Sequence, residues 1–440
     1  MKVLLIIIEF IYILVILPFR KVFCLTTKEK ELELKKNSII SWIVFLATLV
    51  VVLITLITIV FPAFLLGSTS GIKYPIQIDI FETGIWTYQL LLTNFIVFGL
   101  LILHYKNKLP QKISQLFKFI FNFEVSKKVA LLVIVVLLVI YIPFNVAELS
   151  EPDPWIDYTR YVKRTLDQWT FTEFSGGQPF AYVSFSLGKI SGQLFDHYAA
   201  LASLTSISLL VLTYLITYEI SKKRFAGLVA MIIALQSSNF LIYDTTITYP
   251  NFWVLFILLS LYFMYKAWPL SSITFLLAVG SKVIAGFFLP SIMFFAFRAK
   301  IPKRRKIIIS SIYGVILISG FVGVVMLQID VLEDTRTGIK FDTHKFLSGF
   351  TAFAYEFRFD GLIILFLLPL TVGLFIASRN GIKEADSFLA LILGILLTAA
   401  ILPAITAFTN NPYRFMPLVF FFAIGVGILF SKIPVKLDGK

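Results

Sequence analysis

Long apolar runs recur along this chain and constrain its fold more than any other feature of the sequence. A membrane-spanning helix needs about 20 consecutive apolar residues, and many runs of that length are bounded here by charged residues. We expect helices at about 3–19, 38–66, 85–104, 129–147, 198–219, 225–242, 251–266, 271–297, 306–327, 361–378, 387–407 and 414–430. With 58% apolar residues and a mean hydropathy of +0.90, the composition excludes a water-soluble globular protein. The sequence predicts an all-α, polytopic integral membrane protein.

Basic residues concentrate in short segments between alternate apolar runs, and such segments face the cytoplasm in most membrane proteins. We expect cytoplasmic segments at 28–36, 106–128, 221–224, 298–306 and 432–440. The intervening segments 67–84, 148–197, 243–250, 328–360 and 408–413 then lie outside and hold most of the 25 acidic residues. The net charge of +14 therefore reports orientation, and we expect no nucleic-acid partner. A single cysteine, Cys24, excludes an internal disulfide, and three scattered histidines do not fit ordinary zinc-ligand spacing.

The run 271–297 has basic residues at both ends, so one crossing is inconsistent with the alternation. Two short helices that meet at Gly280-Ser281-Lys282 resolve this, because glycine permits a turn and the lysine then lies at the outer end of a hairpin. With the hairpin counted as two, we expect about 13 transmembrane helices, with the N-terminus outside and the C-terminus inside. Lys282 is either a side chain that extends to the interface or a cation that pairs with an anionic ligand.

The outer loop 148–197 contains an amphipathic pattern typical of a helix in the membrane interface. Apolar residues recur at spacings of three and four, opposite charged ones, in the order Trp155, Tyr158, Val162, Leu166 and Trp169. A second interfacial helix is expected from Phe180 to Tyr198, after the Gly176-Gly177 break. These juxtamembrane helices would hold the acidic start of the loop at the membrane surface.

Two acidic residues at the start of this loop are the candidate catalytic groups. Asp153 precedes a proline at a helix start, which is typical of an N-cap, but a capping carboxylate can also face a cleft and act as a general base. Glu151 would orient Asp153 or share a hard divalent cation such as Mg²⁺ or Mn²⁺ with it. The sequence does not decide between these roles, and a metal stays an open possibility.

An ordered set of short motifs resembles the glycosyltransferase C superfamily, the polytopic enzymes that use lipid-linked sugars. The set consists of Asp153-Pro-Trp-Ile-Asp-Tyr-Thr-Arg-Tyr161, Tyr243-Asp-Thr-Thr-Ile-Thr-Tyr-Pro-Asn251, the Lys282 hairpin with Leu289-Pro290, and Asn411-Pro-Tyr-Arg-Phe-Met-Pro417. The resemblance covers about residues 129–430 and is closest to polyprenyl-phosphate-sugar-dependent mannosyltransferases of proteins and lipids. Those relatives usually carry an acidic residue where this chain has Asn251, so Asp244 is a possible substitute.

The resemblance implies a hexosyltransferase whose donor is a polyprenyl-phosphate sugar and whose acceptor is a hydroxyl or amine of a lipid, glycan or protein. It implies Asp153 as the base, with the donor phosphate held by Arg414, Lys282 and Arg160. Further substrate contacts are implied for Tyr158, Asp244 and Tyr413. Arg414 at a helix entry would equally serve as an interfacial anchor. The expected location is a multi-pass protein among the lipids of a prokaryotic plasma membrane, with the active site on the outer face.

The chain divides on this basis into a three-span N-terminal extension with a cytoplasmic amphipathic segment, 1–128, and a transferase-like core, 129–440, with outer loops 148–197 and 328–360. The charges of loop 328–360 fit a solvated cover over the acceptor side. The main alternative function is a transporter or lipid flippase without covalent chemistry, which predicts ionisable residues within the spans or two related halves. A third reading is a non-catalytic subunit of a membrane assembly.

Overall fold

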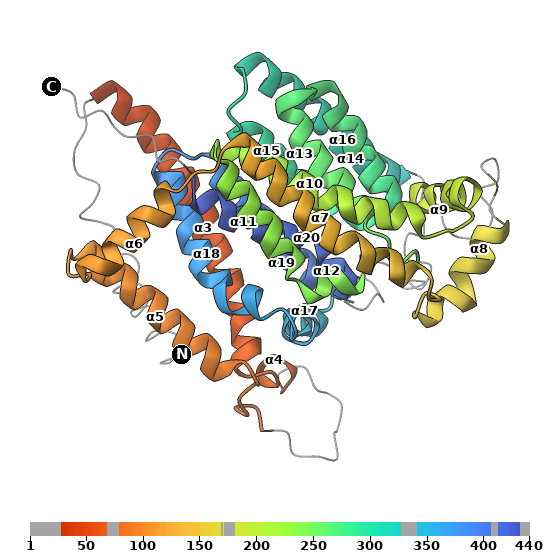
Figure 1. Ribbon diagram of the computed structural model, residues 1–440, viewed down its shortest axis with the longest axis horizontal. Coiled ribbons are helices and arrows are strands. Elements are labelled where there is room, and N and C mark those ends of the chain that lie inside the picture. The colour runs from red at the N-terminus through yellow and green to blue at the C-terminus, as the bar shows by residue number, and fades with distance from the viewer. Residues whose placement is uncertain are drawn as a thin grey trace. The chain divides into compact units, whose positions relative to one another are not determined.

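A computed structural model of the chain describes residues 28–67, 79–168, 170, 181–326, 341–405 and 412–431. Within these residues it contains helices and no strands, as the sequence predicts. The chain separates into residues 1–43 and residues 44–440, and the second unit contains nearly all of the described helices (Figure 1). The first expected span, 3–19, lies outside the described residues.

The helices follow the expected apolar runs closely. They are α3 (Lys28–Val60), α4 (Phe64–Gly67), α5 (Thr87–Tyr105), α6 (Gln111–Asn122), α7 (Lys127–Leu149), η3 (Tyr158–Val162), α8 (Lys163–Gln168), α9 (Tyr182–Phe195), α10 (Ala200–Ser221), α11 (Arg224–Leu235), α12 (Ser238–Ile242), α13 (Phe252–Lys266), α14 (Trp268–Ser281), η5 (Val283–Phe288), α15 (Leu289–Arg298), α16 (Lys303–Met326), α17 (Thr343–Glu356), α18 (Gly361–Arg379), α19 (Glu384–Ile405), η6 (Pro412–Phe415) and α20 (Met416–Leu429).

Seven helical segments among the described residues are long and apolar enough to cross a membrane, judged by length and composition. They are Ile39–Val60 of α3, then α5, α7, α10, α18, α19 and the segment Pro412–Leu429. Four further apolar helical segments have 10 to 17 residues, namely α11, α13, α14 and Val283–Arg298. These helices are those of a helical membrane protein, whereas the expected count of about 13 spans stays a prediction.

The expected helix 225–242 is wrong as a continuous helix, because it breaks between α11 and α12. The Ser237 hydroxyl accepts a hydrogen bond from the Phe240 backbone N–H, and the Asp360 carboxylate accepts from the N–H groups of Ser238 and Asn239. Side-chain oxygens that satisfy backbone N–H groups in this way begin a new helix. The hydrogen bonds of Ser237 and Asp360 therefore break the helix, although the run is apolar enough to be continuous.

The expected break near Lys282 is confirmed. Helix α14 ends at Ser281, Lys282 is extended with φ −162°, and the 3₁₀ helix η5 follows. Gly280 has a different role from the one expected, since its φ is not positive. A Cβ at Gly280 would lie 2.8 Å from Val183 Cγ2, so the glycine allows α14 and α9 to approach closely.

Polar residues gather at two ends of the unit 44–440. The segments expected outside are linked at one end, for example by hydrogen bonds from Thr246 to Asp153 and from Asn239 to the Pro412 carbonyl. We call this the cavity end, for the cavity described below. Helix α13 runs away from it and α14 returns to it.

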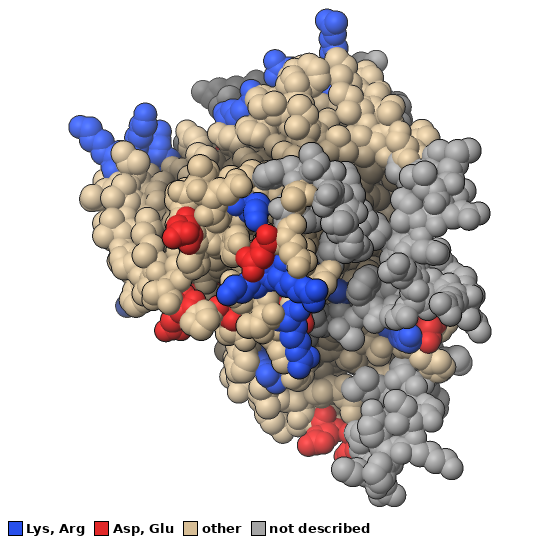
Figure 2. All heavy atoms as spheres, turned by 90° about the vertical axis from the view of Figure 1, so that its right-hand side faces the viewer, with Lys and Arg blue, Asp and Glu red and all other residues tan. Residues whose placement is uncertain are grey.

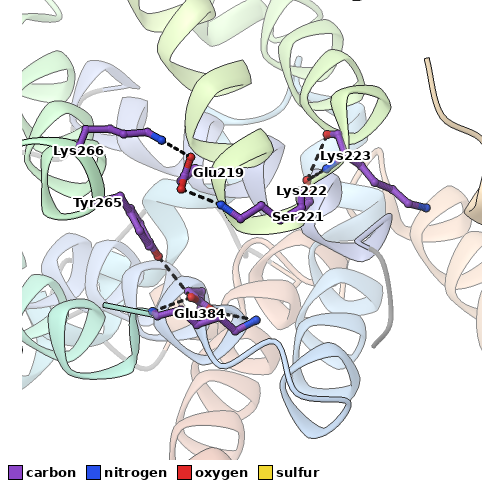
Figure 3. Close-up of polar contacts among 8 residues, drawn as sticks. Glu219, Ser221, Lys222, Lys223, Tyr265, Lys266 and Glu384 are labelled. Carbon is purple, nitrogen blue, oxygen red and sulfur yellow. Dashed lines mark hydrogen bonds and ion pairs between the residues drawn. The ribbon is translucent and has the colours of Figure 1, made fainter. Parts of the chain in front are cut away.

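The opposite end, which we call the ion-pair end, links the segments expected to be cytoplasmic. Glu219 binds both Lys222 and Lys266 there, and the Tyr265 hydroxyl donates to Glu384 (Figure 3). These contacts join α10 to α13 and α13 to α19 at this end of the unit.

The core lies around α20. In its membrane-length segment, 78% of the residues are buried, against 11% in α5 and 17% in α7. α20 contacts α10, α11, α18 and α19, whereas α5 packs chiefly on α18. The central helices thus fix the cavity end, and α5 and α7 lie at the periphery of the unit.

Candidate active site

The cavity end contains a cavity of about 270 Å³. Five segments that are distant in sequence line it: the η3–α8 region, the start of α9, the loop before α13, the junction at Lys282 and the junction at Tyr413. The lining residues are Asp157, Tyr161, Val162, Leu166, Ala181, Ser184, Phe185, Ile247, Thr248, Tyr249, Pro250, Ser281, Lys282 and Tyr413. Four of these segments, all except the start of α9, carry the motifs on which the resemblance was based. The sequence motifs and the cavity thus coincide.

The amphipathic helix expected in the first outer loop positions the carboxylate of this cavity. Val162 and Leu166 are buried against a cluster that includes Phe185 of α9 and Ile247, while the charged residues opposite are exposed. Figure 2 shows basic and acidic side chains gathered on the face of the molecule at this end, which α8 and α9 partly cover. Because its apolar side packs on α9, the helix holds Asp157 at the edge of the cavity.

Asp157 is paired with a phenol rather than with a cation. The Tyr249 hydroxyl donates a hydrogen bond to the Asp157 carboxylate. Burial, and then the hydrogen bond and negative charge of Asp157, raise the pKa of Tyr249, so the phenol stays protonated and remains a donor. One carboxylate oxygen of Asp157 is oriented by this bond, and the side chain is exposed at the edge of the cavity.

Aromatic rings form one wall of the cavity. Tyr249 stacks on Tyr413 with ring centroids 4.1 Å apart and planes 8° apart. Behind them Trp155 stacks on Tyr243 with centroids 5.1 Å apart. Flat, rigid aromatic faces with hydroxyl groups at their rims suit a ligand that has both apolar and hydrogen-bonding surfaces.

Lys282 supplies a positive charge next to these rings. Its ammonium nitrogen lies 3.7 Å from the centroid of the Tyr413 ring and 5.9 Å from that of Tyr249. Among the described residues no carboxylate lies within salt-bridge distance of Lys282. Desolvation, and then the positive charge of Arg414, lower the pKa of Lys282. An anion in the cavity would reverse both effects.

Arg414 lies beside the same wall, as expected. Its guanidinium carbon is 5.6 Å from the Tyr413 ring centroid, and its Nε donates to the Tyr413 hydroxyl at 3.2 Å. The structure therefore brings Lys282 next to Tyr413 and Arg414, although the lysine comes from a different motif.

Asp153 occupies a different place from the one expected of a base, because its carboxylate holds the second outer loop. One oxygen accepts hydrogen bonds from the Thr246 and Thr248 hydroxyls, at 2.7 and 3.0 Å, and from two backbone N–H groups of the same loop. The other oxygen accepts from the Trp155 N–H at 3.1 Å. Both oxygens of Asp153 are thus engaged in holding the loop Thr246–Thr248 and the start of its own helix. Asp153 is also absent from the cavity lining.

The remaining expected site residues lie outside the cavity. Glu151 and Arg160 are exposed. Tyr158 packs against the buried cluster of Val162 and Leu166, and burial raises its pKa. The positions of Tyr158 and Arg160 reflect their helix, whose apolar side is turned to α9 and whose charged side is turned to the surface, whereas Glu151 precedes that helix.

Asp244 is buried below the cavity in a polar network. One of its carboxylate oxygens accepts from the Tyr141 hydroxyl at 2.6 Å and from the Asn145 amide at 3.1 Å. The Ser206 hydroxyl donates to its backbone carbonyl. Burial raises the pKa of Asp244, with a further contribution from Glu148, while the two hydrogen bonds oppose the shift. Asp244 thus anchors the loop that carries Tyr249 to α7 and α10.

No three histidine, cysteine or acidic side chains come together as metal ligands within the described part of the chain. Glu151 is exposed, and both oxygens of Asp153 accept hydrogen bonds from donors of the protein. In the loop 328–360, Glu333, Asp334 and Arg336 lie outside the described residues. The described part of that loop forms α17, capped by Asp342, and does not line the cavity.

Sequence reasoning missed Asp157 and Tyr249. Both stand within the quoted motifs, and a signal was present: a carboxylate before proline is committed to a cap, so the next acidic residue in the helix was the freer one. The hydrogen bond between Tyr249 and Asp157 depends on how two loops pack together, so neither segment predicts it from its own sequence.

Comparison of the chain with protein-family models finds no family that matches, and comparison with curated proteins and with solved structures finds no significant similarity.

Proposed function

We propose that this chain is a membrane glycosyltransferase that moves a sugar from a polyprenyl-phosphate donor to a hydroxyl or amine acceptor. The observation that carries the proposal is a single cavity lined by both Asp157 and Lys282. The stacked rings of Tyr249 and Tyr413 line the same cavity. A carboxylate and a cation in one cavity with an aromatic wall provide a base, a phosphate contact and a surface for a sugar ring.

The reaction requires one bond to form and one to break. The acceptor oxygen or nitrogen bonds to the anomeric carbon, and the bond from that carbon to the phosphate oxygen breaks. The acceptor proton passes to Asp157, and polyprenyl phosphate leaves with one more negative charge than the phosphodiester carried. Lys282 and Arg414 stabilise that charge as it develops.

We assign the base role to Asp157 rather than to Asp153, because Asp157 lines the cavity and Asp153 binds the loop Thr246–Thr248. Asp153 is then a positioning residue that holds Tyr249 in place. Arg160, exposed on the charged side of its helix, is removed from the proposed phosphate contacts.

The proposal also includes the orientation inferred from charge. The chain would cross a prokaryotic plasma membrane about 13 times, with the cavity end outside, where a polyprenyl-phosphate sugar presents its headgroup. The ion-pair end would then face the cytoplasm. The sugar and the acceptor follow from neither the sequence nor the cavity.

The test is transfer by the purified full-length chain in detergent, supplied with polyprenyl-phosphate hexoses and scored by release of polyprenyl phosphate. Asp157→Asn should lower the rate by about 100-fold or more, the usual contribution of a general base. Asp167→Asn is the matched control, because Asp167 also accepts a tyrosine hydroxyl bond, from Tyr198 at 2.7 Å, but does not line the cavity. Equal rates for the wild type and Asp157→Asn would overturn the base assignment, and no transfer from any such donor would overturn the function.

A further inference from the structure

Helix α6 is a short amphipathic helix in which no residue is buried. It joins α5 to α7, two helices of membrane-spanning length, and so lies where both leave the apolar layer on the same side. At about 3.6 residues per turn, Ile113, Leu116, Phe117 and Ile120 fall on one side of it. Leu116 is 54% exposed, and Ile113, Phe117 and Ile120 are half-buried, so this side is only partly covered within the described chain.

Lysines border the apolar side. Lys112 and Lys118 lie on its two opposite edges, and Lys106, Lys108, Lys127 and Lys128 flank the helix in sequence. All six are exposed, and none forms a salt bridge with a described residue.

The one acidic residue of this segment, Glu124, is already used within the fold. Its carboxylate accepts backbone N–H bonds from Val125, Arg224 and Phe225 at 3.0 to 3.4 Å. The segment 106–128 therefore presents uncompensated positive charge.

The position of α6 is fixed at its C-terminal end. The Phe121 ring stacks on Phe430 with centroids 5.4 Å apart, and the Lys223 ammonium donates to the Phe121 carbonyl. Phe123 packs edge-on against Phe225. These contacts hold the end of α6 against α11 and α20 and leave its first two turns uncovered, so the orientation of the apolar side is set by the fold.

We propose that α6 and its flanking lysines bind the headgroups of anionic phospholipids, with Leu116 and its apolar neighbours among the acyl chains. A helix with an apolar side, lysines on both edges and no internal counter-charge has the features of an interfacial anionic-lipid site. The site lies at the ion-pair end and is independent of the proposed chemistry in the cavity.

The first test compares retention of phosphatidylglycerol and phosphatidylcholine by the purified full-length chain, measured by native mass spectrometry. Lys112→Gln with Lys118→Gln should weaken phosphatidylglycerol binding by about fivefold per lysine at low salt, and less at high salt. Lys163→Gln with Arg164→Gln removes the same charge from exposed positions on α8 and serves as the matched control. An equal loss in both double variants, or no loss in the first, would overturn the proposal.

A second test measures depth in vesicles that contain phosphatidylglycerol. In a Cys24→Ser background, a fluorophore on Leu116→Cys should be quenched by lipids brominated on their acyl chains, and one on the adjacent Gln115→Cys should not. Equal quenching at the two positions, or none at Leu116, would mean that the apolar side does not lie in the bilayer, and the proposal would fail.

Discussion

The two ends of the unit 44–440 differ in whether their charged side chains are paired with opposite charges. At the ion-pair end, cations and carboxylates neutralise each other: Arg298 with Asp386 in the interior, and Glu219 with two lysines near the surface. At the cavity end, Lys282 faces aromatic rings, and Asp157 faces a phenol. Where charges neutralise each other locally they join helices, and where they do not they are available to a charged ligand. The difference predicts which substitutions affect folding and which affect binding.

The largest expected effect is at the ion-pair end. Arg298→Met would leave Asp386, which is fully buried, without its cation and should lower the free energy of unfolding by about 3–5 kcal/mol. Thermal unfolding in detergent measures this. Glu219→Gln, which breaks pairs to the more exposed Lys222 and Lys266, should cost about 1 kcal/mol or less.

The double variant Arg298→Met with Asp386→Leu should recover most of the loss, because it removes both buried charges. If the double variant is no more stable than Arg298→Met alone, the ion pair with Asp386 is not the reason why Arg298 stabilises the fold. If Glu219→Gln costs as much as Arg298→Met, burial does not distinguish the two sites.

The next effect is at the cavity end and should spare folding. Lys282→Met removes a cation that has no carboxylate partner among the described residues, so the unfolding temperature should stay the same or rise. Transfer should fall by about 100-fold if Lys282 stabilises the departing phosphate. Binding of polyprenyl phosphate is measured alongside, with the exposed Lys163→Met as control. If Lys282→Met greatly lowers stability and leaves transfer unchanged, Lys282 serves folding rather than ligand binding, and the distinction between the two ends fails.

The smallest predicted effect concerns the loop that carries Tyr249. Burial raises the pKa of Asp244, so the folded chain holds this proton more tightly than the unfolded chain does. The associated stability is complete below the ordinary carboxylate pKa and is lost as pH rises through the raised value, by about 1 kcal/mol per pH unit. Asp244→Asn retains an acceptor for Tyr141 and cannot ionise. Its unfolding temperature should therefore fall less with rising pH than that of the wild type.

Asp342→Asn is the matched control for this pH dependence. Hydrogen bonds from the backbone of Lys345 and His344 lower the pKa of Asp342, so it is ionised throughout that pH range. The Asp342 variant should keep the pH slope of the wild type. Identical slopes for the wild type and Asp244→Asn would show that Asp244 is not the group that titrates.

Most of the apolar helices could be predicted from the sequence to within a few residues because they depend on local hydropathy, but α3 begins at Lys28, ten residues before the expected run 38–66. The break at Lys282 followed from charge on both sides of one apolar run. The break at Ser237 did not, because it depends on Asp360, which is more than 100 residues away and binds the N–H groups that open α12. Non-local hydrogen bonds of this kind leave no periodic pattern.

The candidate site was predictable in its segments and less so in its residues. Lys282, Arg414 and Tyr413 come together as expected, since cations at the ends of apolar runs must lie near one surface. The roles of Asp153 and Asp157 depend on which carboxylate meets the Thr246–Thr248 loop, and that is decided by packing between α8, α9 and α13. Hydropathy and spacing carry no information about that choice.

The stack of Tyr249 on Tyr413 has a consequence for synthesis. More than half of the chain length separates Asp157 from Tyr413. The carboxylate therefore leaves the ribosome long before the ring that completes its cavity, and α20, at the centre of the core, is made after all the other described helices. A chain that stalls before Pro412 would contain nearly every membrane-length helix and lack the wall on which Lys282 rests. The site is thus absent from any chain that ends before Pro412 and forms only once Tyr413 is in place.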